Sequence, residues 1–343
     1  MIVVMSKDAT KEQIAKVEKE LALLGFKTHP IYGEVKTVIG AIGDKSNIKS
    51  NTLLTMPGVE RIIPIMKPFK LASREFKQTR SCIDLGDVKI GGEQVVVMAG
   101  PCAVEDEKSY MEIARCAKEA GASILRGGAY KPRTSPYSFQ GLEEDGLKIM
   151  AAAREATGLK LVTEVVDTRD VELVASYADI LQIGARNMQN FRLLQEVGQS
   201  KKPVLLKRGI AATIEEWLMA AEYIMDTGNY NVILCERGIR TYETTTRFTM
   251  DISSIPVVKE LSHLPIVVDP SHAAGNWKYV PALAKGAVAT GADGLIIEMH
   301  TNPSSALSDG PQSLRPDNFA VLMKELELVA NAVSRTIFKK DQQ

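Results

Sequence analysis

The sequence predicts an α/β protein in which a (β/α)8 TIM barrel follows a small ferredoxin-like α+β domain. From residue 94 onward, eight short apolar runs alternate with helical patterns, which is typical of a parallel sheet buried on both faces. Eight strand–helix units in about 240 residues match the size of a closed barrel. Residues 1–67 show the order β-α-β-β-α-β of a ferredoxin-like fold. The predicted domains are residues 1–67, a linker with a hairpin at 68–93, and the barrel at 94–343.

The small domain is expected to contain four strands and two helices. Its first helix is predicted between residues 8 and 24, because Ile14, Val17 and Leu21 lie at helical spacing and Gly25 ends the pattern. The remaining expected elements are strands at 2–5, 27–32, 37–42 and 59–65, and a short helix at 48–54. A module of this size buries little core alone and often binds a partner copy or a small ligand.

The barrel strands are expected at the eight apolar runs, with helices in the gaps. The runs are residues 95–98, 123–125, 160–164, 180–183, 204–206, 232–234, 266–268 and 294–297. The helices include residues 108–120, 143–157, 215–227 and 281–290. Upstream, residues 82–88 and 93–98 are expected to pair as a hairpin around Gly91 and Gly92. An open doubly wound sheet is disfavoured, because no GxGxxG follows the first strand and near-even repeats suit closure.

Charge and composition exclude several classes of protein. The 343 residues contain 42 Lys+Arg and 42 Asp+Glu, so the chain lacks the basic excess of proteins that grip nucleic acid or anionic membranes. No apolar stretch approaches the roughly 20 residues of a membrane span. The start becomes charged too soon for a secretory signal, and the four cysteines form no CxxC pair. We therefore expect a cytoplasmic protein with free thiols and neither nucleic-acid nor membrane partners.

Cationic side chains follow four of the eight predicted strands. The active site of a (β/α)8 barrel lies at the C-terminal ends of its strands. One lysine or arginine there is usually a solvated loop charge, but so many indicate a site for phosphate or carboxylate groups. Uncompensated charge would destabilise the empty barrel, so bound anions are the expected compensation. The cations are Arg126, Lys131, Arg133, Arg186, Lys207 and Arg237.

Four other residues at the strand ends form a possible metal site. Cys102, His272, Glu298 and Asp309 offer a thiolate, an imidazole and two carboxylates, a mixed set that suits a divalent first-row transition metal. Glu298 ends a buried apolar run, where a carboxylate without a partner would be strongly destabilising. The spacing alone leaves open that Cys102 is a core thiol and His272 a hydrogen-bonded polar residue.

Two other chemistries can be weighed from the sequence. A Ser-His triad is poorly supported, because the chain contains no GxSxG motif. A Schiff-base aldolase needs a lysine with a lowered pKa, and the candidates are Lys131 and Lys207. Both lie among arginines, which would lower the pKa of an amine. The aldolase therefore stays as an alternative.

Six motifs in one order carry a resemblance that covers nearly the whole chain. They are AGPCAVE at 99–105, GGAYKPRTSPYSFQG at 127–141, IGARNMQN at 183–190, LLKRG at 205–209, CERG at 235–238 and DPSHAAG at 269–275. With them the sequence resembles 3-deoxy-D-arabino-heptulosonate 7-phosphate (DAHP) synthases, in the subgroup with an N-terminal ferredoxin-like regulatory domain. The sister family, 3-deoxy-manno-octulosonate 8-phosphate synthase, is the alternative. It resembles KANRSS where this chain has KPRTS, and its metal-free members carry Asn in place of Cys102.

The resemblance implies an activity and the residues that perform it. The family condenses phosphoenolpyruvate with erythrose 4-phosphate and releases phosphate, as the first step of the shikimate pathway. It implies a divalent metal (Mn, Fe, Co, Zn or similar) on Cys102, His272, Glu298 and Asp309. It implies phosphoenolpyruvate on Arg126, Lys131, Arg186, Lys207 and Arg237, and the sugar phosphate on Arg133, Thr134 and Ser135. Lys131 is the expected proton donor, beside the catalytic ligands Cys102 and His272, and Glu164 is a candidate to orient water.

The resemblance also assigns a role to residues 1–67. It implies that this domain binds tyrosine or phenylalanine as an effector and closes over the barrel mouth, and that the chain forms a homotetramer. A dimerisation module is the alternative for this domain. For the whole chain, a non-catalytic sensor of sugar phosphates or amino acids is the alternative, and the presence of all four metal-ligand residues argues against it.

Overall fold

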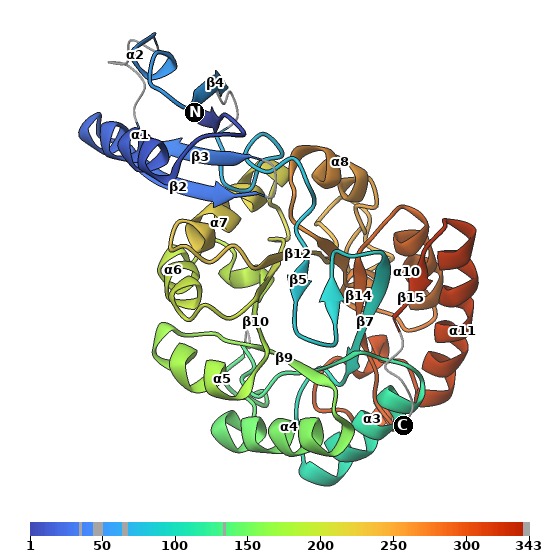
Figure 1. Ribbon diagram of the computed structural model, residues 1–343. Coiled ribbons are helices and arrows are strands. Elements are labelled where there is room, and N and C mark those ends of the chain that lie inside the picture. Colours follow the sequence, from blue (N-terminus) through green and yellow to red (C-terminus); the bar gives the residue numbers. More distant parts are fainter. Residues whose placement is uncertain (34–35, 44–50, 64–67, 133–134, 339–343) are drawn as a thin grey trace. The chain divides into compact units, whose positions relative to one another are not determined.

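The protein has two compact units, Met1–Thr79 and Arg80–Gln343 (Figure 1). The structure is a computed structural model that describes residues 1–33, 36–43, 51–63, 68–132 and 135–338. Each unit has a core of its own. The second unit begins within the stretch 68–93 that the sequence predicts as a linker. No helix among these described residues is both long and apolar enough to cross a bilayer.

The first unit is a four-stranded antiparallel sheet with the strand order β2-β3-β1-β4. Its elements are β1 (Ile2–Met5), α1 (Lys11–Leu23), β2 (Lys27–Tyr32), β3 (Thr37–Ile42), α2 (Asn51–Leu54) and β4 (Val59–Ile63). Thr10 and Gln13 cap the start of α1 reciprocally, and α1 buries Ile14, Val17 and Leu21 in the unit's core. This order confirms the ferredoxin-like prediction. Residues 48–50 and 64–65 of two predicted elements lie outside the described residues.

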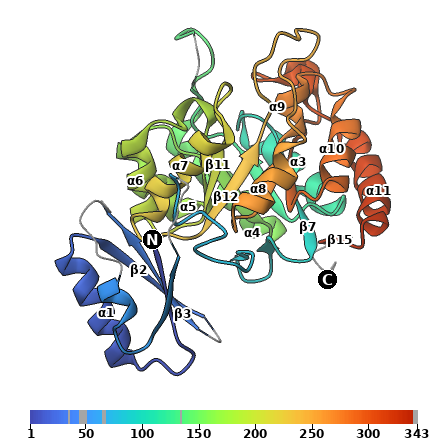
Figure 2. The ribbon, with the colours of Figure 1, turned by 90° about the horizontal axis from the view of Figure 1, so that it is seen from above.

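The second unit is a closed barrel of eight parallel strands surrounded by helices (Figures 1 and 2). Each strand pairs with the next along the chain, and the last pairs with the first. The strands are β7 (Gln94–Gly100), β8 (Ile124–Gly127), β9 (Lys160–Glu164), β10 (Ile180–Ile183), β11 (Val204–Lys207), β12 (Val232–Glu236), β13 (Ile266–Val268) and β14 (Gly294–Glu298). All eight predicted runs are confirmed, with bounds that differ by at most two residues.

The helices of the second unit follow the strands in the expected alternation. They are α3 (Glu107–Glu119), α4 (Glu143–Thr157), α5 (Val171–Tyr177), α6 (Phe191–Gln199), α7 (Ile214–Met225), α8 (Ser254–Leu261), α9 (Pro270–Ala274), α10 (Val280–Ala289) and α11 (Pro316–Ala332). Outward-facing Val95 and Val97 of β7 are buried as fully as inward-facing Val96 and Met98. Burial on both faces explains why the strands have continuous apolar sequences.

A short hairpin packs into the interior of the barrel. Strands β5 (Ile83–Asp84) and β6 (Lys89–Ile90) pair antiparallel, so the predicted hairpin of residues 82–88 with 93–98 is wrong. The reason is that β7 uses both of its edges within the barrel, for β8 on one side and for β14 and the short β15 (Thr336–Ile337) on the other. The hairpin side chains join the apolar core made by the inward-facing residues of the strands. The hairpin fills one end of the barrel interior, so an active site has room only at the opposite end, where the strands have their C-termini.

A layer of mostly polar side chains at the barrel mouth follows from the alternation of side chains along each strand. Residues two positions apart on a strand face the same side. The inward-facing apolar residues are Met98, Ile124, Val162, Ile180, Leu205, Cys235, Val267 and Ile296. The residues two positions later are Gly100, Arg126, Glu164, Gln182, Lys207, Arg237, Asp269 and Glu298. One register thus places a polar layer directly above the apolar core, at the end where barrel active sites lie.

Candidate active site

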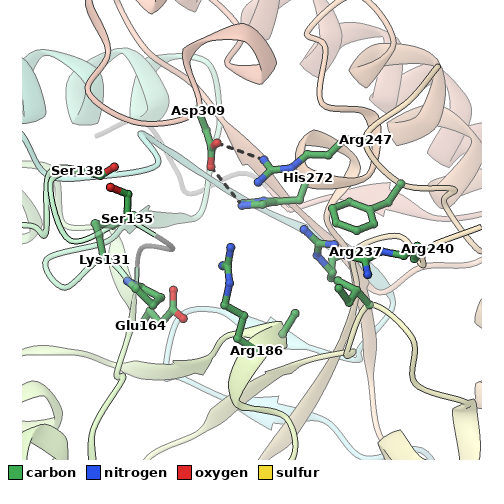
Figure 3. Close-up of a pocket in the computed structure, with 14 residues that line it drawn as sticks. Lys131, Ser135, Ser138, Glu164, Arg186, Arg237, Arg240, Arg247, His272 and Asp309 are labelled. Carbon is green, nitrogen blue, oxygen red and sulfur yellow. Dashed lines mark hydrogen bonds and ion pairs between the residues drawn. The ribbon is translucent and has the colours of Figure 1, made fainter. Parts of the chain in front are cut away.

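A cavity of about 550 Å³ opens at the C-terminal ends of the strands (Figure 3). Its charged lining contains five Lys/Arg side chains and two carboxylates. The lining residues are Lys131, Pro132, Ser135, Ser138, Glu164, Ala185, Arg186, Ile210, Arg237, Arg240, Arg247, Phe248, His272 and Asp309. This excess of cations in a concave site is suited to small anionic molecules.

The predicted anion-binding residues divide into two groups. Lys131, Ser135, Arg186 and Arg237 line the cavity. Arg126 and Lys207 are each 4% exposed and belong to the polar layer of the strands rather than to the lining. Arg133 and Thr134 lie outside the described residues.

Arg186 and Arg237 reach the cavity from different elements. Arg186 lies in the 3-10 turn Ala185–Asn187 after β10, and Figure 3 shows its guanidinium between Glu164 on one side and Arg237 on the other. The guanidinium carbon of Arg237 lies 4.1 Å from the centre of the Phe248 ring. Its buried Nη1 has no hydrogen-bond partner among the described residues. An unpaired buried donor is costly, so this atom is well placed to bind a ligand oxygen.

The four predicted metal ligands meet beside this cavity. Sγ of Cys102 lies 3.2 Å from Oδ2 of Asp309. Nε2 of His272 lies 3.5 Å from Oε1 of Glu298 and 3.8 Å from Oδ2 of Asp309. Ligand atoms about 2.0–2.3 Å from a tetrahedral ion lie roughly 3.3–3.8 Å from each other. The three distances given above match this spacing, and the ligand atoms of Cys102, Glu298 and Asp309 all lie within 4.8 Å of one another. A sulfur, a nitrogen and two oxygens form a donor set that suits a divalent transition metal.

A buried carboxylate orients the imidazole of His272. Asp269 accepts a hydrogen bond from the backbone N–H of His272 at 2.9 Å, and its Oδ2 lies 2.7 Å from Nδ1 of the ring. Nε2 therefore faces the carboxylates of Glu298 and Asp309. Burial lowers the pKa of His272, which favours the neutral ring that metals bind. Alternation along β13 could have identified Asp269, because it lies two positions after the inward-facing Val267.

Two of the predicted substrate cations are already paired with carboxylates. Nη1 of Arg126 donates to Oε1 of Glu298 at 3.1 Å and to the carbonyl of Pro101 at 2.6 Å. Nζ of Lys207 lies 2.5 Å from Oδ2 of Asp269. The prediction that bound anions compensate the cations is wrong for these two. An unpaired charge at this depth would be strongly destabilising, and the polar layer supplies carboxylates of its own.

Lys131 links the cavity to the thiol of Cys102. Its Nζ donates to the Cys102 carbonyl at 2.9 Å and to Sγ at 3.1 Å. Gly128 permits this approach, because a Cβ there would lie 2.7 Å from Cδ of Lys131. Burial, followed by the charge of Glu298, raises the pKa of Cys102 to about 11. The thiol is therefore protonated at neutral pH, and a metal would displace its proton.

The ionisation of Lys131 does not support a Schiff-base aldolase. Burial alone would lower its pKa, but Cys102 and Glu164 outweigh that effect and raise it. Arg126 lowers this pKa as expected, but the net shift of the Lys131 pKa is upward. Lys207 is held in the ion pair with Asp269. The raised pKa of Lys131 is the opposite of what keeps a nucleophilic lysine neutral, and the amine of Lys207 is occupied by Asp269.

Several site residues were not identified from the sequence. Arg240, Arg247 and Phe248 lie between β12 and α8, in a connection without a regular strand or helix. Gln312 ends a 3-10 turn (Gly310–Gln312) directly after Asp309. No periodic pattern reports where such loops fold back, so no sequence signal could have placed these residues.

Fold and site together define a class of protein: a (β/α)8 barrel whose mouth combines a cavity lined by cations with a cluster of side chains able to hold a metal. Residues 69–332 match the family model of the DAHP synthetase I family. Residues 1–67 match the model of the DAHP synthase ferredoxin-like domain. The chain therefore belongs to the DAHP synthetase I family.

Individual relatives agree with this assignment. Phospho-2-dehydro-3-deoxyheptonate aldolase of Thermotoga maritima is 50% identical over 333 residues, which cover 97% of this chain and 98% of that protein. A crystal structure of phospho-2-dehydro-3-deoxyheptonate aldolase (DAHP synthase) from Thermotoga maritima has a TM-score of 0.79 at 49% identity, covering 98% of this chain and 99% of that chain. The 2-dehydro-3-deoxyphosphooctonate aldolase of Geotalea uraniireducens is 33% identical over 269 residues, 72% of this chain and 97% of that protein. The likeness to the first relative thus extends over both units.

Proposed function

We propose that this chain is a 3-deoxy-7-phosphoheptulonate synthase, a transferase that condenses phosphoenolpyruvate with erythrose 4-phosphate. The products are 3-deoxy-D-arabino-heptulosonate 7-phosphate and phosphate, in the first step of the shikimate pathway to aromatic amino acids. The observation that carries the proposal is the cationic cavity directly beside the cluster of Cys102, His272, Glu298 and Asp309. A sensor of sugar phosphates would need the cavity but not this cluster.

The anionic groups of the two substrates match the cations of the site. Phosphoenolpyruvate carries a carboxylate and a phosphate, and the sugar carries a second phosphate. We assign phosphoenolpyruvate to Lys131, Arg186 and Arg237, with Arg126 and Lys207 in the polar layer below. We assign the sugar phosphate to Ser135 and to its neighbours Arg133 and Thr134. Cations from several separate strand ends would fix both substrates in one orientation.

The proposed reaction forms one carbon–carbon bond and breaks one carbon–oxygen bond. The methylene carbon of phosphoenolpyruvate attacks the aldehyde carbon of the sugar, and water adds to carbon 2, from which phosphate then leaves. Lys131 is protonated and lines the cavity, so we assign it the proton that the new alkoxide accepts. Glu164 lines the same cavity and accepts a hydrogen bond from Gln182 at 3.3 Å, which leaves it able to orient the water.

We further propose that Cys102, His272, Glu298 and Asp309 hold a divalent metal such as Mn, Fe, Co or Zn. Such an ion, when bound, acts as a Lewis acid that polarises the aldehyde. The support is the donor chemistry: Cys102 and Glu298 are almost completely buried, and their ligand atoms and that of Asp309 lie within 4.8 Å of one another.

One assay tests the substrates and the metal together. Consumption of phosphoenolpyruvate should require erythrose 4-phosphate, stop with a chelator, and return when a divalent metal is added back. Arabinose 5-phosphate should support less than about a hundredth of this rate, since a site that hydrogen-bonds one substrate discriminates strongly against misfitting analogues. Faster turnover with arabinose 5-phosphate would instead identify an octulosonate 8-phosphate synthase. Full activity in chelator would contradict the metal.

The first unit is proposed to be regulatory, with tyrosine or phenylalanine as the effector. Deleting Met1–Thr79, the whole compact unit, should leave turnover by the barrel while abolishing inhibition by either amino acid. The deletion ends at Thr79 because buried Phe69, Leu71 and Phe76 belong to the first unit. Inhibition of the truncated protein equal to that of the full chain would contradict a regulatory role.

Two further properties stay predictions. The homotetramer follows from the resemblance alone, and sedimentation analysis of the full chain would measure it. A cytoplasmic location follows from the sequence alone, whose four cysteines form no CxxC pair. Free thiols are the form expected in a reducing compartment.

A further inference from the structure

The two carboxylates of the proposed metal site each have an inner and an outer oxygen. The inner oxygens, Oε1 of Glu298 and Oδ2 of Asp309, lie 3.5 and 3.8 Å from Nε2 of His272. The outer oxygens make different contacts. Oε2 of Glu298 accepts a hydrogen bond from Nε2 of Gln312 at 2.7 Å. Oδ1 of Asp309 accepts one from Nη1 of Arg247 at 3.2 Å, shown as a dashed line in Figure 3.

These two outer donors are connected to each other. Nη1 of Arg247 also donates to Oε1 of Gln312 at 2.8 Å. The amide of Gln312 therefore accepts from Arg247 with its oxygen and donates to Glu298 with its nitrogen, which leaves a single sensible orientation of the amide. Gln312 is 2% exposed, so water cannot readily replace either bond. A continuous path of hydrogen bonds thus joins Asp309 to Glu298 through two side chains that are not ligands.

The backbone holds this path in place. Asp309 has a φ of 53°, in the left-handed region that non-glycine residues seldom adopt, and its carbonyl accepts a hydrogen bond from the backbone N–H of Gln312 at 3.2 Å. One short segment therefore supplies both a ligand and the residue that contacts the other carboxylate. Arg247 reaches the same segment from the connection between β12 and α8.

We infer that Arg247 and Gln312 form a brace that presents one oxygen of each carboxylate to the metal and so sets the metal affinity. The inference rests on the proposed metal site. Charge-assisted hydrogen bonds to the outer oxygens oppose rotation of the carboxylates, and the guanidinium offsets part of their negative charge. Residues that orient metal ligands commonly change affinity by about 10- to 100-fold when they are replaced. Arg247 and Gln312 are positioning residues in this scheme.

The test measures metal binding by the full chain rather than turnover. Co²⁺ bound to a cysteine thiolate gives a charge-transfer absorption band, and competition with a chelator gives the dissociation constant. We expect Gln312→Met and Arg247→Met each to weaken Co²⁺ binding by about 10- to 100-fold. Because the two side chains act together, the double variant should bind Co²⁺ only slightly more weakly than the weaker of the two single variants. Matched controls are Arg240→Met, in the same cavity wall, and Gln199→Met, on the surface of α6.

The outcomes separate this inference from the proposed function. If the wild-type protein shows no thiolate band, or a band that survives Cys102→Ala, the proposed metal site fails and the brace fails with it. If the wild-type protein binds Co²⁺ and both brace variants bind equally tightly, only the brace is overturned. If the losses of Co²⁺ binding free energy in the two single variants add fully in the double variant, the two residues act independently and the inference that they form one brace is overturned. Gln312→Asn keeps the amide but shortens it, so it should lose affinity as well and provides a second folded variant.

Discussion

Replacing Cys102 with alanine is expected to abolish metal binding and turnover together. Cys102 is 2% exposed, and its Sγ contacts Oδ2 of Asp309 at 3.2 Å, so no solvent ligand can easily take its place. Losing Lewis-acid stabilisation of several kcal/mol lowers the rate by on the order of a thousandfold or more. The measurements are metal content after dialysis and the rate of phosphoenolpyruvate consumption with erythrose 4-phosphate.

A second cysteine provides the matched control for this experiment. Cys116 lies on α3, away from the strand ends, and is half-buried. Cys116→Ala should keep both metal content and turnover, which separates loss of the ligand from loss of any thiol. Lys131 donates to the Cys102 carbonyl as well as to Sγ, so one of its two contacts survives the substitution. A Cys102→Ala protein that turns over without bound metal would refute the metal assignment.

Much of the fold and part of the site could be predicted because they depend on local periodicity. The eight strands were found from continuous apolar runs, which only a sheet buried on both faces requires. Arg126, Lys207 and Glu298 were found because each ends such a run. The same alternation places Asp269 in the polar layer. Strand periodicity thus predicts which residues enter the barrel mouth, and not which of them pair.

The remainder of the site depends on contacts that no local pattern encodes. Arg126 and Lys207 were expected to be compensated by ligands, yet Glu298 and Asp269 neutralise them across the barrel. Each of these pairs joins the ends of two strands that have one other strand between them. Such pairing is a property of the closed barrel, so a linear pattern cannot report it. Arg247 enters from a long irregular connection for the same reason. The hairpin was misplaced because the sequence does not reveal that β7 has no free edge.

Arg208 should be the residue whose loss most destabilises the barrel outside the site. Its Nη1 contacts Oε2 of Glu236 at 3.1 Å and Oδ2 of Asp251 at 2.7 Å. Arg208 is 4% exposed and Glu236 is 0% exposed. Arg208→Met would leave Glu236 as a buried charge without its cation, and breaking such a pair costs about 3–5 kcal/mol. Thermal unfolding at pH 7.5 measures the loss, and exposed Arg186→Met is a matched control expected to change stability by less than about 0.5 kcal/mol.

The pH dependence of this variant distinguishes a buried charge from lost packing. Burial raises the pKa of Glu236 even with Arg208 present, and removing the guanidinium raises it further. A carboxyl group whose pKa is higher in the folded state binds its proton more tightly there. Stability is therefore lost as pH rises through that folded pKa and is regained as pH falls. The deficit of Arg208→Met relative to wild type should shrink between pH 7.5 and pH 5.5.

A double variant completes the test. Adding Glu236→Gln to Arg208→Met removes the unpaired charge, so it should recover part of the stability at pH 7.5 and eliminate the extra pH dependence. The backbone N–H of Gly238 donates to Oε1 of Glu236 at 2.7 Å, and the glutamine amide oxygen can still accept that bond. Gly238 follows Arg237, so keeping this bond also keeps the cavity wall in place. A deficit of equal size at both pH values, unchanged in the double variant, would show that packing of the Arg208 side chain is what stabilises this region.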